Sequence, residues 1–230
     1  MICKSFVFRH AETFDNSSGV FSGWRDSVLT PKGLMQAQEI AEQLKKHEVD
    51  YAFSSHLKRA RRTLEIVLQG RSSVQVFTDD RLMERCYGQL QGKEKKKMKL
   101  EDPDLYAQIH RGYRFVPPDG ESLEMVENRV MSFLEQLRKW LKQNPGNVAI
   151  SCHSNSIRAF RRVFENLSTS QMCNLESPQN CAIMYEIRQG NLTNENIKGK
   201  TNKQKWKGIV ISRKVKLATD PMNLLSVYYH

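Results

Sequence analysis

The 230-residue chain has 39% hydrophobic and 27% charged side chains, a composition that suits one globular domain with or without an appended tail. Its net charge of +11 favours anionic partners, which leaves phosphorylated metabolites, nucleic acids and acidic membranes equally open. The five cysteines are widely spaced with no C-x-x-C pair, which excludes a disulfide framework and a zinc site, and no apolar run approaches the ~20 residues that span a bilayer. Because the N-terminus also lacks the pattern of a signal peptide, we expect a reduced, cytoplasmic protein that binds no metal and no membrane.

The first predicted strand, Ser5–Phe8, is rich in aromatic and β-branched side chains and is followed by Arg9 and His10. His10 would therefore lie just past the carboxyl end of a strand, which is the edge where open α/β sheets bind ligands. Arg9 and His10 together suit chemistry on an anion there. Taken alone, however, a histidine beside a strand is more often a hydrogen-bonded residue of the core or the surface than a nucleophile.

The next predicted elements alternate between helices and strands. Thr30 is a good N-cap before a proline, and apolar residues at helical spacing predict an amphipathic helix of roughly four turns after it. Strands are predicted at Tyr51–Ser54 and Val74–Phe77, separated by a helix at 57–68 that carries four basic residues near its start. An irregular connection is expected at 79–92. This β-α-β-α-β order predicts a parallel sheet with helices on its faces.

The middle of the chain is predicted to be helical. Residues 93–99 include five lysines, and we interpret most of them as a solvated helix face. The Pro-Pro-Asp-Gly segment at 117–120 breaks the chain, and a clear apolar stripe then predicts a long helix over 123–141.

A second strand-end histidine follows this helix. The apolar segment 147–152 predicts another strand, which ends at His153, and a helical pattern begins at Ile157. His10 and His153 thus occupy equivalent positions. If their strands are neighbours in one parallel sheet, both imidazoles reach the same crevice.

The last part of the chain contains one further predicted strand, Cys181–Ile187, before its composition changes. From Gly190 onward Asn and Lys dominate, and Gly208–Ile211 is either an edge strand or part of a loose tail. We therefore divide the chain into a domain at 1–190 and a basic C-terminal extension of unknown role at 191–230.

Several short motifs occur along the chain in a characteristic order. They are carried by Arg9-His10-Ala11, Phe21-Ser22-Gly23-Trp24, Leu57-Lys58-Arg59-Ala60, Glu84-Arg85-Cys86-Tyr87-Gly88 and His153-Ser154-Asn155-Ser156-Ile157-Arg158. The first three resemble segments of the histidine phosphatase superfamily. The last two are similar to segments of its cofactor-dependent phosphoglycerate mutases. The resemblance covers about residues 5 to 187, and the motifs are specific as a set.

The resemblance implies a three-layer α-β-α fold with a mostly parallel central sheet, like that of the phosphoglycerate mutases. It also implies that His10 forms a phosphohistidine and that Glu84 acts as general acid and base. Arg9, Arg59 and His153 would hold the phosphoryl oxygens. The implied substrate-binding residues are Asn16, Ser22, Gly23, Arg59, Tyr87, Lys95, His110, Arg111, Ser154 and Asn155.

The implied activity is the interconversion of 3-phosphoglycerate and 2-phosphoglycerate, primed by 2,3-bisphosphoglycerate and requiring no metal. An alternative is a phosphomonoesterase that hydrolyses a small phosphorylated metabolite through the same intermediate. A non-enzymatic phospholigand binder and a basic nucleic-acid-binding protein also stay open, although the lysine run lacks aromatic residues for base stacking. A homo-oligomer is compatible with the sequence.

Three departures from the family pattern favour the phosphatase alternative. Ala11 and Ser154 stand where the family has glycine, which would bring side-chain atoms close to the phosphate. His110 and Arg111 fall where the mutases usually carry two arginines.

Without the motif, Glu84 would be interpreted as a salt-bridge partner of a neighbouring arginine.

Overall fold

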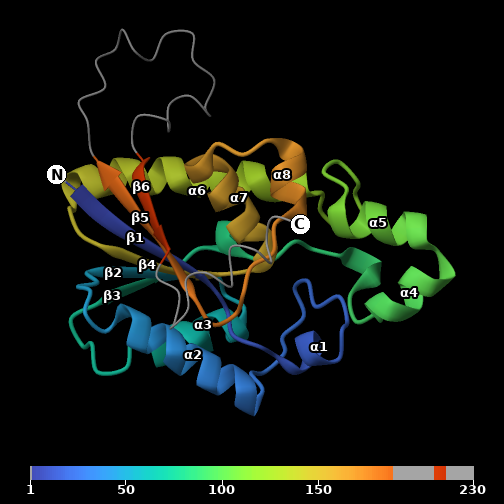
Figure 1. Cartoon of the computed structure of the whole chain (residues 1–230), viewed down its shortest axis with the longest axis horizontal. Helices are drawn as coiled ribbons and strands as arrows, with labels where there is room; N and C mark the ends of the chain where they lie inside the picture. The colour runs from blue at the N-terminus through green and yellow to red at the C-terminus, as the bar shows by residue number, and fades with distance from the viewer. Residues whose placement is uncertain (1, 189–209, 216–230) are drawn as a thin grey trace, which may run out of the picture.

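The computed structural model describes residues 2–188 and 210–215, which form a central sheet flanked by helices. The strands are β1 (Ile2–Arg9), β2 (Tyr51–Ser54), β3 (Gln75–Thr78), β4 (Val148–Cys152), β5 (Ala182–Arg188) and β6 (Val210–Val215). Their order in the sheet is β3-β2-β4-β1-β5-β6 (Figure 1). The strands from β3 to β1 run parallel, whereas β5 runs antiparallel to both β1 and β6. The predicted mostly parallel sheet is confirmed.

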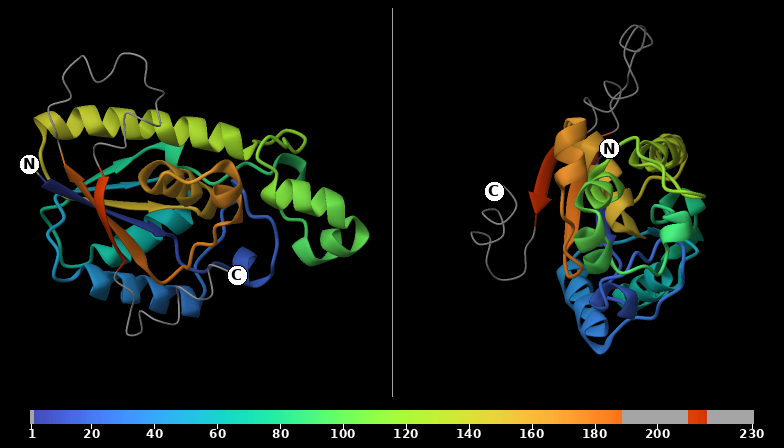
Figure 2. Two further views of the ribbon diagram at one scale, coloured as in Figure 1. Left: turned by 45° about the horizontal axis from the view of Figure 1, so that its top comes forward. Right: turned by 90° about the vertical axis from the view of Figure 1, so that its right-hand side faces the viewer.

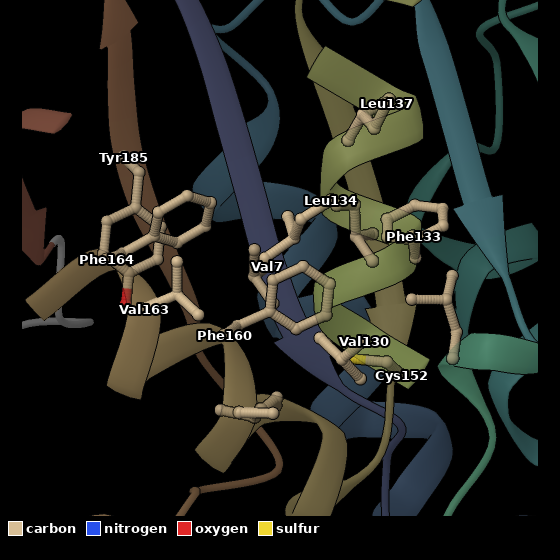
Figure 3. Packing of buried hydrophobic residues seen from close by; sticks show 14 of the residues in the cluster. Val7, Val130, Phe133, Leu134, Leu137, Cys152, Phe160, Val163, Phe164 and Tyr185 are labelled. Atoms are coloured by element: carbon tan, nitrogen blue, oxygen red, sulfur yellow. The ribbon is translucent and has the colours of Figure 1, made fainter. Parts of the chain in front are cut away.

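Helices cover both faces of this sheet and complete the three predicted layers (Figures 1 and 2). The helices of the outer layers are α2 (Pro31–Leu44) and α3 (Lys58–Val67) on one face, and α6 (Leu123–Gln143) and α7 (Ser154–Glu165) on the other. Successive side chains of a strand point to opposite faces, so β1 supplies both halves of the core. Phe6 and Phe8 pack with residues of α2 and α3, and Val7 packs with residues of α6 and α7 (Figure 3).

Short helices gather at the end of the molecule where β1 and β4 terminate. They are α1 (Phe14–Ser17), α4 (Lys95–Glu101), α5 (Pro103–Arg111) and α8 (Thr169–Asn174). Figure 2 shows α4 and α5 projecting from the same end as α1. Side-chain caps stabilise three of these helices: Thr13 caps α1, Asp102 caps α5 and Ser168 caps α8. Of these four helices the sequence predicted only α4, which begins within the lysine run. The other three are too short to show a periodic apolar stripe.

Most other boundaries agree with the sequence to within a few residues. The connection at 79–92 is irregular as predicted, except for two 3-10 helices at Asp80–Leu82 and Gly88–Leu90. Helix α7 begins directly after His153, three residues earlier than predicted. Of the segment 208–211, Val210 and Ile211 belong to β6, which pairs with β5 as an edge strand, whereas residues 208 and 209 lie outside the described residues. Within the described ranges, no helix is both long enough and apolar enough to cross a bilayer.

Candidate active site

The two strand-end histidines lie side by side. β1 and β4 are hydrogen-bonded neighbours whose register pairs Arg9 with Cys152, so both strands end at the same level. The backbone N–H of His10 continues this pairing by donating to the carbonyl of Cys152 at 2.9 Å. The ring centroids of His10 and His153 are 5.0 Å apart, and both side chains are buried. The topology therefore brings together two imidazoles that are far apart in the sequence.

Two hydrogen bonds fix the tautomer of His10. Its Nδ1 lies 2.8 Å from the carbonyl oxygen of Ala11, which can only accept, so Nδ1 carries the proton. Its Nε2 accepts from Nε of Arg59 at 3.2 Å and therefore presents a lone pair. Burial, reinforced by the positive charges of Arg59 and Arg9, lowers the pKa of His10 well below its usual range. His10 is thus a neutral imidazole with an unprotonated Nε2 at neutral pH.

Arg59 is held at the N-terminus of α3 by two backbone carbonyls. Its Nη1 donates to the carbonyl of Arg25 and its Nη2 to that of Gly23, each at 2.7 Å, and only 1% of Arg59 is exposed. Gly23 has a φ of 52°, and a Cβ there would lie 2.2 Å from Oε1 of Gln91. The left-handed backbone of the turn that holds Arg59 therefore favours glycine at this position.

Buried polar atoms around the histidines lack protein partners within the described part of the chain. Nε2 of His153 lies 2.7 Å from Oγ of Ser55, but its Nδ1 has no partner. Nε of Arg9 and Oγ of Ser22 are likewise buried and unpaired. Buried polar groups in proteins are nearly always hydrogen-bonded, so this arrangement indicates a polar ligand. The positive charge of Arg9 and Arg59 makes an anion the fitting choice.

Glu84 lies across the pocket, in the irregular connection that follows β3. Its Oε1 accepts from the backbone N–H of Arg85 at 2.7 Å and from Nδ2 of Asn155 at 2.8 Å. No described residue donates to its Oε2. Glu84 is not a salt-bridge partner of the neighbouring arginines, because Arg81 pairs with Asp79 and the guanidinium of Arg85 donates to backbone carbonyls. One carboxyl oxygen of Glu84 is thus available to a ligand.

These groups line a pocket of about 170 Å³. The lining residues are Arg9, His10, Asn16, Ser22, Gly23, Arg59, Glu84, Tyr87, Lys95, His110, Ser154, Asn155, Arg158 and Glu176. All the predicted site residues are among them except Arg111 and His153, and the buried ring of His153 lies directly against that of His10. Ala11 does not line the pocket, so its methyl group does not crowd a ligand, whereas Ser154 does line it. Among the described residues, no group of three or more potential metal ligands converges.

At the outer end of the pocket the sequence predicts that Lys95, His110 and Arg111 bind substrate, and the structure differs from this expectation at His110 and Arg111. Lys95 is half-buried over the ring of Phe21, while the other lysines of the run are exposed. His110 contributes no positive charge near pH 7, because burial and the adjacent charge of Arg111 lower its pKa to about 4. Arg111 turns away from the pocket and donates to the carbonyls of Cys173 and Leu175 and to the carboxylate of Glu176.

Sequence reasoning missed two lining residues. Arg158 belongs to the same motif as His153, and its position one helical turn beyond Asn155 could have placed it in the site. Its Nη1 donates to Oδ1 of Asn155 at 2.8 Å. Glu176 follows α8 in a loop, and no motif or periodicity marks it.

The buried histidines predict a dependence of stability on pH. Burial, followed by nearby positive charge, lowers the pKa of both His10 and His153 in the folded protein, whereas in the unfolded chain they titrate near 6.5. The unfolded state therefore binds more protons below about pH 6.5, and the free energy of unfolding should fall as the pH drops through that value. Urea unfolding between pH 7.5 and pH 5 measures this slope. The double variant His10→Gln/His153→Gln should have a smaller slope, and an unchanged slope would contradict the assignment.

Comparisons with known proteins agree with this geometry. A family model described as the histidine phosphatase superfamily (branch 1) matches residues 6–197. A 2,3-bisphosphoglycerate-dependent phosphoglycerate mutase of Parvibaculum lavamentivorans is 34% identical over 188 residues, which cover 79% of this chain and 89% of the relative. The structure of the α-ribazole phosphatase of Shigella flexneri matches with a TM-score of 0.71 and 26% identity, covering 81% of this chain and 91% of that one. A phosphoglycerate mutase structure from Bacillus anthracis has the same fold, with a TM-score of 0.69 and 19% identity over 90% of this chain and 96% of its own.

Proposed function

The chain belongs to the histidine phosphatase superfamily (branch 1), and from this premise we propose that it interconverts 3-phosphoglycerate and 2-phosphoglycerate through a phosphohistidine at His10. The observation that carries the proposal is the oriented imidazole of His10, whose Nε2 lone pair faces Arg59 at the pocket floor. The proposal also includes the cytoplasmic location that the sequence predicts, and a small phosphorylated metabolite as the partner of the protein.

In the proposed reaction, a phosphoryl oxygen replaces Nε2 of His10 as the acceptor of the hydrogen bond from Nε of Arg59. The freed Nε2 then attacks phosphorus, and the bond from phosphorus to the leaving oxygen breaks. Glu84 gives its proton to that oxygen through the carboxyl oxygen that has no partner. In the return step Glu84 takes a proton from the incoming hydroxyl, which attacks phosphorus as the bond to His10 breaks. Asn155 keeps Glu84 in place by donating to its other oxygen at 2.8 Å.

The charge on the transferred group is met by Arg9, Arg59 and Nδ1 of His153, together with the N-terminus of α7. Because Nε2 of His153 faces the hydroxyl of Ser55, which can donate to it, Nδ1 is free to carry the proton and donate to a phosphoryl oxygen.

Arg59 should contribute strongly to the rate, because two carbonyls hold its guanidinium in position before substrate binds. We expect Arg59→Ala to cost about 3 kcal/mol of transition-state stabilisation, which corresponds to a fall in kcat/KM on the order of 10²-fold. Steady-state kinetics measure this effect. Arg61→Ala is a matched control on the same helix, because Arg61 is exposed and outside the pocket. Equal values for the two variants would place Arg59 outside the reaction.

The priming role of 2,3-bisphosphoglycerate fits the residues present. When bound, the primer supplies the phosphoryl group that first loads His10. The unpaired polar atoms of Arg9, Ser22 and His153 suit one phosphate, and Lys95 and Arg158 supply positive charge for the other end.

Retention of the substrate separates a mutase from a phosphatase, and the residues that cover the pocket support retention. Tyr87 lies directly before a 3-10 helix and Lys95 opens α4, and both side chains line the pocket. Together with Arg158 they provide polar contacts beyond the transferred phosphate. The name of the Parvibaculum lavamentivorans relative supports the same activity.

Hydrolysis is a second candidate, and the outer end of the pocket favours it. Arg111 does not line the pocket, His110 is neutral, and Glu176 adds negative charge where a substrate carboxylate would bind. A substrate without a carboxylate would meet no repulsion there. The phosphatase name of the Shigella flexneri structure supports this candidate.

A coupled assay with 3-phosphoglycerate separates the two candidates. We expect 2-phosphoglycerate to form, and to form faster when 2,3-bisphosphoglycerate is added. Release of inorganic phosphate without 2-phosphoglycerate, and without dependence on the primer, would replace the mutase by the phosphatase.

A further inference from the structure

We infer that Glu176 is a specificity-determining residue that competes with an anionic group of the substrate for the positive charges at the outer end of the pocket. This inference rests on the proposed function, because it concerns the part of a phosphorylated substrate that is not transferred. It names a residue that belongs to none of the motifs found in the sequence.

The position of Glu176 gives it contact with both the pocket and Arg111. Glu176 lines the pocket, and its Oε1 pairs with Nη2 of Arg111. Nη1 of Arg111 donates to the carbonyls of Cys173 and Leu175, which lie at the end of α8 just before Glu176. The guanidinium is therefore committed on two sides, and the carboxylate, not Arg111, faces the ligand. Only 28% of the Arg111 side chain is exposed, so little of it is open to a ligand.

Glu176 is also the carboxylate that interacts electrostatically with the positively charged side chains at this end of the pocket. Burial alone would raise the pKa of Glu176, but its hydrogen bond with Arg111 and the positive charges of Arg111 and Arg158 hold that pKa below the usual range. Burial lowers the pKa of Arg9, Lys95 and Arg158, and the negative charge of Glu176 opposes part of this shift in each. Glu84 is the only other carboxylate among the lining residues, and it lies beside Asn155. A substrate carboxylate or second phosphate must therefore share these cations with Glu176.

A pair of ligands isolates this effect. 3-Phosphoglycerate and glycerol 3-phosphate carry the same phosphate ester, but only the first has a carboxylate. Any influence of Glu176 on the phosphate itself is common to both and cancels in the ratio of their dissociation constants. Binding calorimetry gives this ratio without requiring turnover.

Glu176→Gln removes the charge and keeps an oxygen that can accept from Arg111. We expect the variant to bind 3-phosphoglycerate roughly fivefold more tightly relative to glycerol 3-phosphate, as suits an exposed charge interaction. High salt should reduce the change, because it screens exposed charges. In steady-state kinetics the change should appear in KM for the acid rather than in kcat. Glu42→Gln is the control, since Glu42 pairs with Lys45 on α2 and does not line the pocket.

A structural role of Glu176 would not produce this pattern. If Glu176→Gln changed the affinity for both ligands equally, left both unchanged, or had an effect that salt did not reduce, the inference would be overturned. These outcomes can occur whether or not the chain proves to be a mutase, because they are read from binding. The proposed function fails by a different result, namely the absence of phosphoryl transfer in the wild-type protein.

Discussion

Replacing His10 with asparagine should reduce turnover by at least about 10⁴-fold, because the nucleophile of the reaction is lost. Asparagine preserves a polar side chain of similar reach but offers no nitrogen lone pair for attack on phosphorus. The wild-type protein should incorporate radioactive phosphate in an acid-labile, base-stable form. The His10→Asn protein should incorporate none.

This experiment needs a folding check and a control variant. The buried pair of His10 and His153 contributes to the core around the site, so the variant must first be shown to unfold cooperatively. His56→Asn serves as the control, because His56 is exposed, pairs with Asp80 and does not line the pocket. Normal turnover in His10→Asn, or labelling that persists in it, would refute the role of His10.

Replacing Glu84 with glutamine should lower kcat by about 10²-fold to 10⁴-fold, the usual contribution of a positioned general acid. Glutamine keeps an oxygen that can accept from Asn155 and from the backbone of Arg85, so the shape of the pocket is retained. The dissociation constant of inorganic phosphate should therefore change little. What is lost is the proton for the leaving oxygen.

The leaving group provides the sharper test of Glu84. A p-nitrophenolate departs without a proton, so p-nitrophenyl phosphate should load His10 in Glu84→Gln nearly as fast as in the wild type. The second step still needs a base, and the phosphoenzyme should accumulate as a burst of p-nitrophenolate followed by slow turnover. If both substrates slowed equally with no burst, Glu84 would not be the proton donor.

The parts of the fold that follow from local pattern could be predicted from the sequence. Apolar runs gave the strands, and polar residues directly after two of them located His10 and His153. Arg59 could not be separated from its basic neighbours by composition, since Lys58, Arg61 and Arg62 have the same character. Only the motif distinguished it. In the structure, the carbonyls of Gly23 and Arg25 hold it in place.

The rest depends on contacts between distant segments. The direction of Arg111 is set by the carbonyls of Cys173 and Leu175, more than 60 positions further along the chain, so no local pattern reveals that it leaves the pocket. Glu176 lies in a loop without periodicity, and its place in the site appears only when α8 packs beside α7. The depressed pKa of His110 likewise arises from burial that its sequence neighbours do not indicate.

The pairing of β1 with β4 sets the geometry of the two histidines. The separation of the two imidazoles is set by main-chain ladder bonds that end at Arg9 and Cys152. Shifting one strand by a single residue would displace one ring by about 3.3 Å and turn it to the opposite face of the sheet. Apolar side chains of these strands can therefore be exchanged for others of similar volume at some cost in folding free energy, while the two imidazoles stay aligned as long as this register is kept.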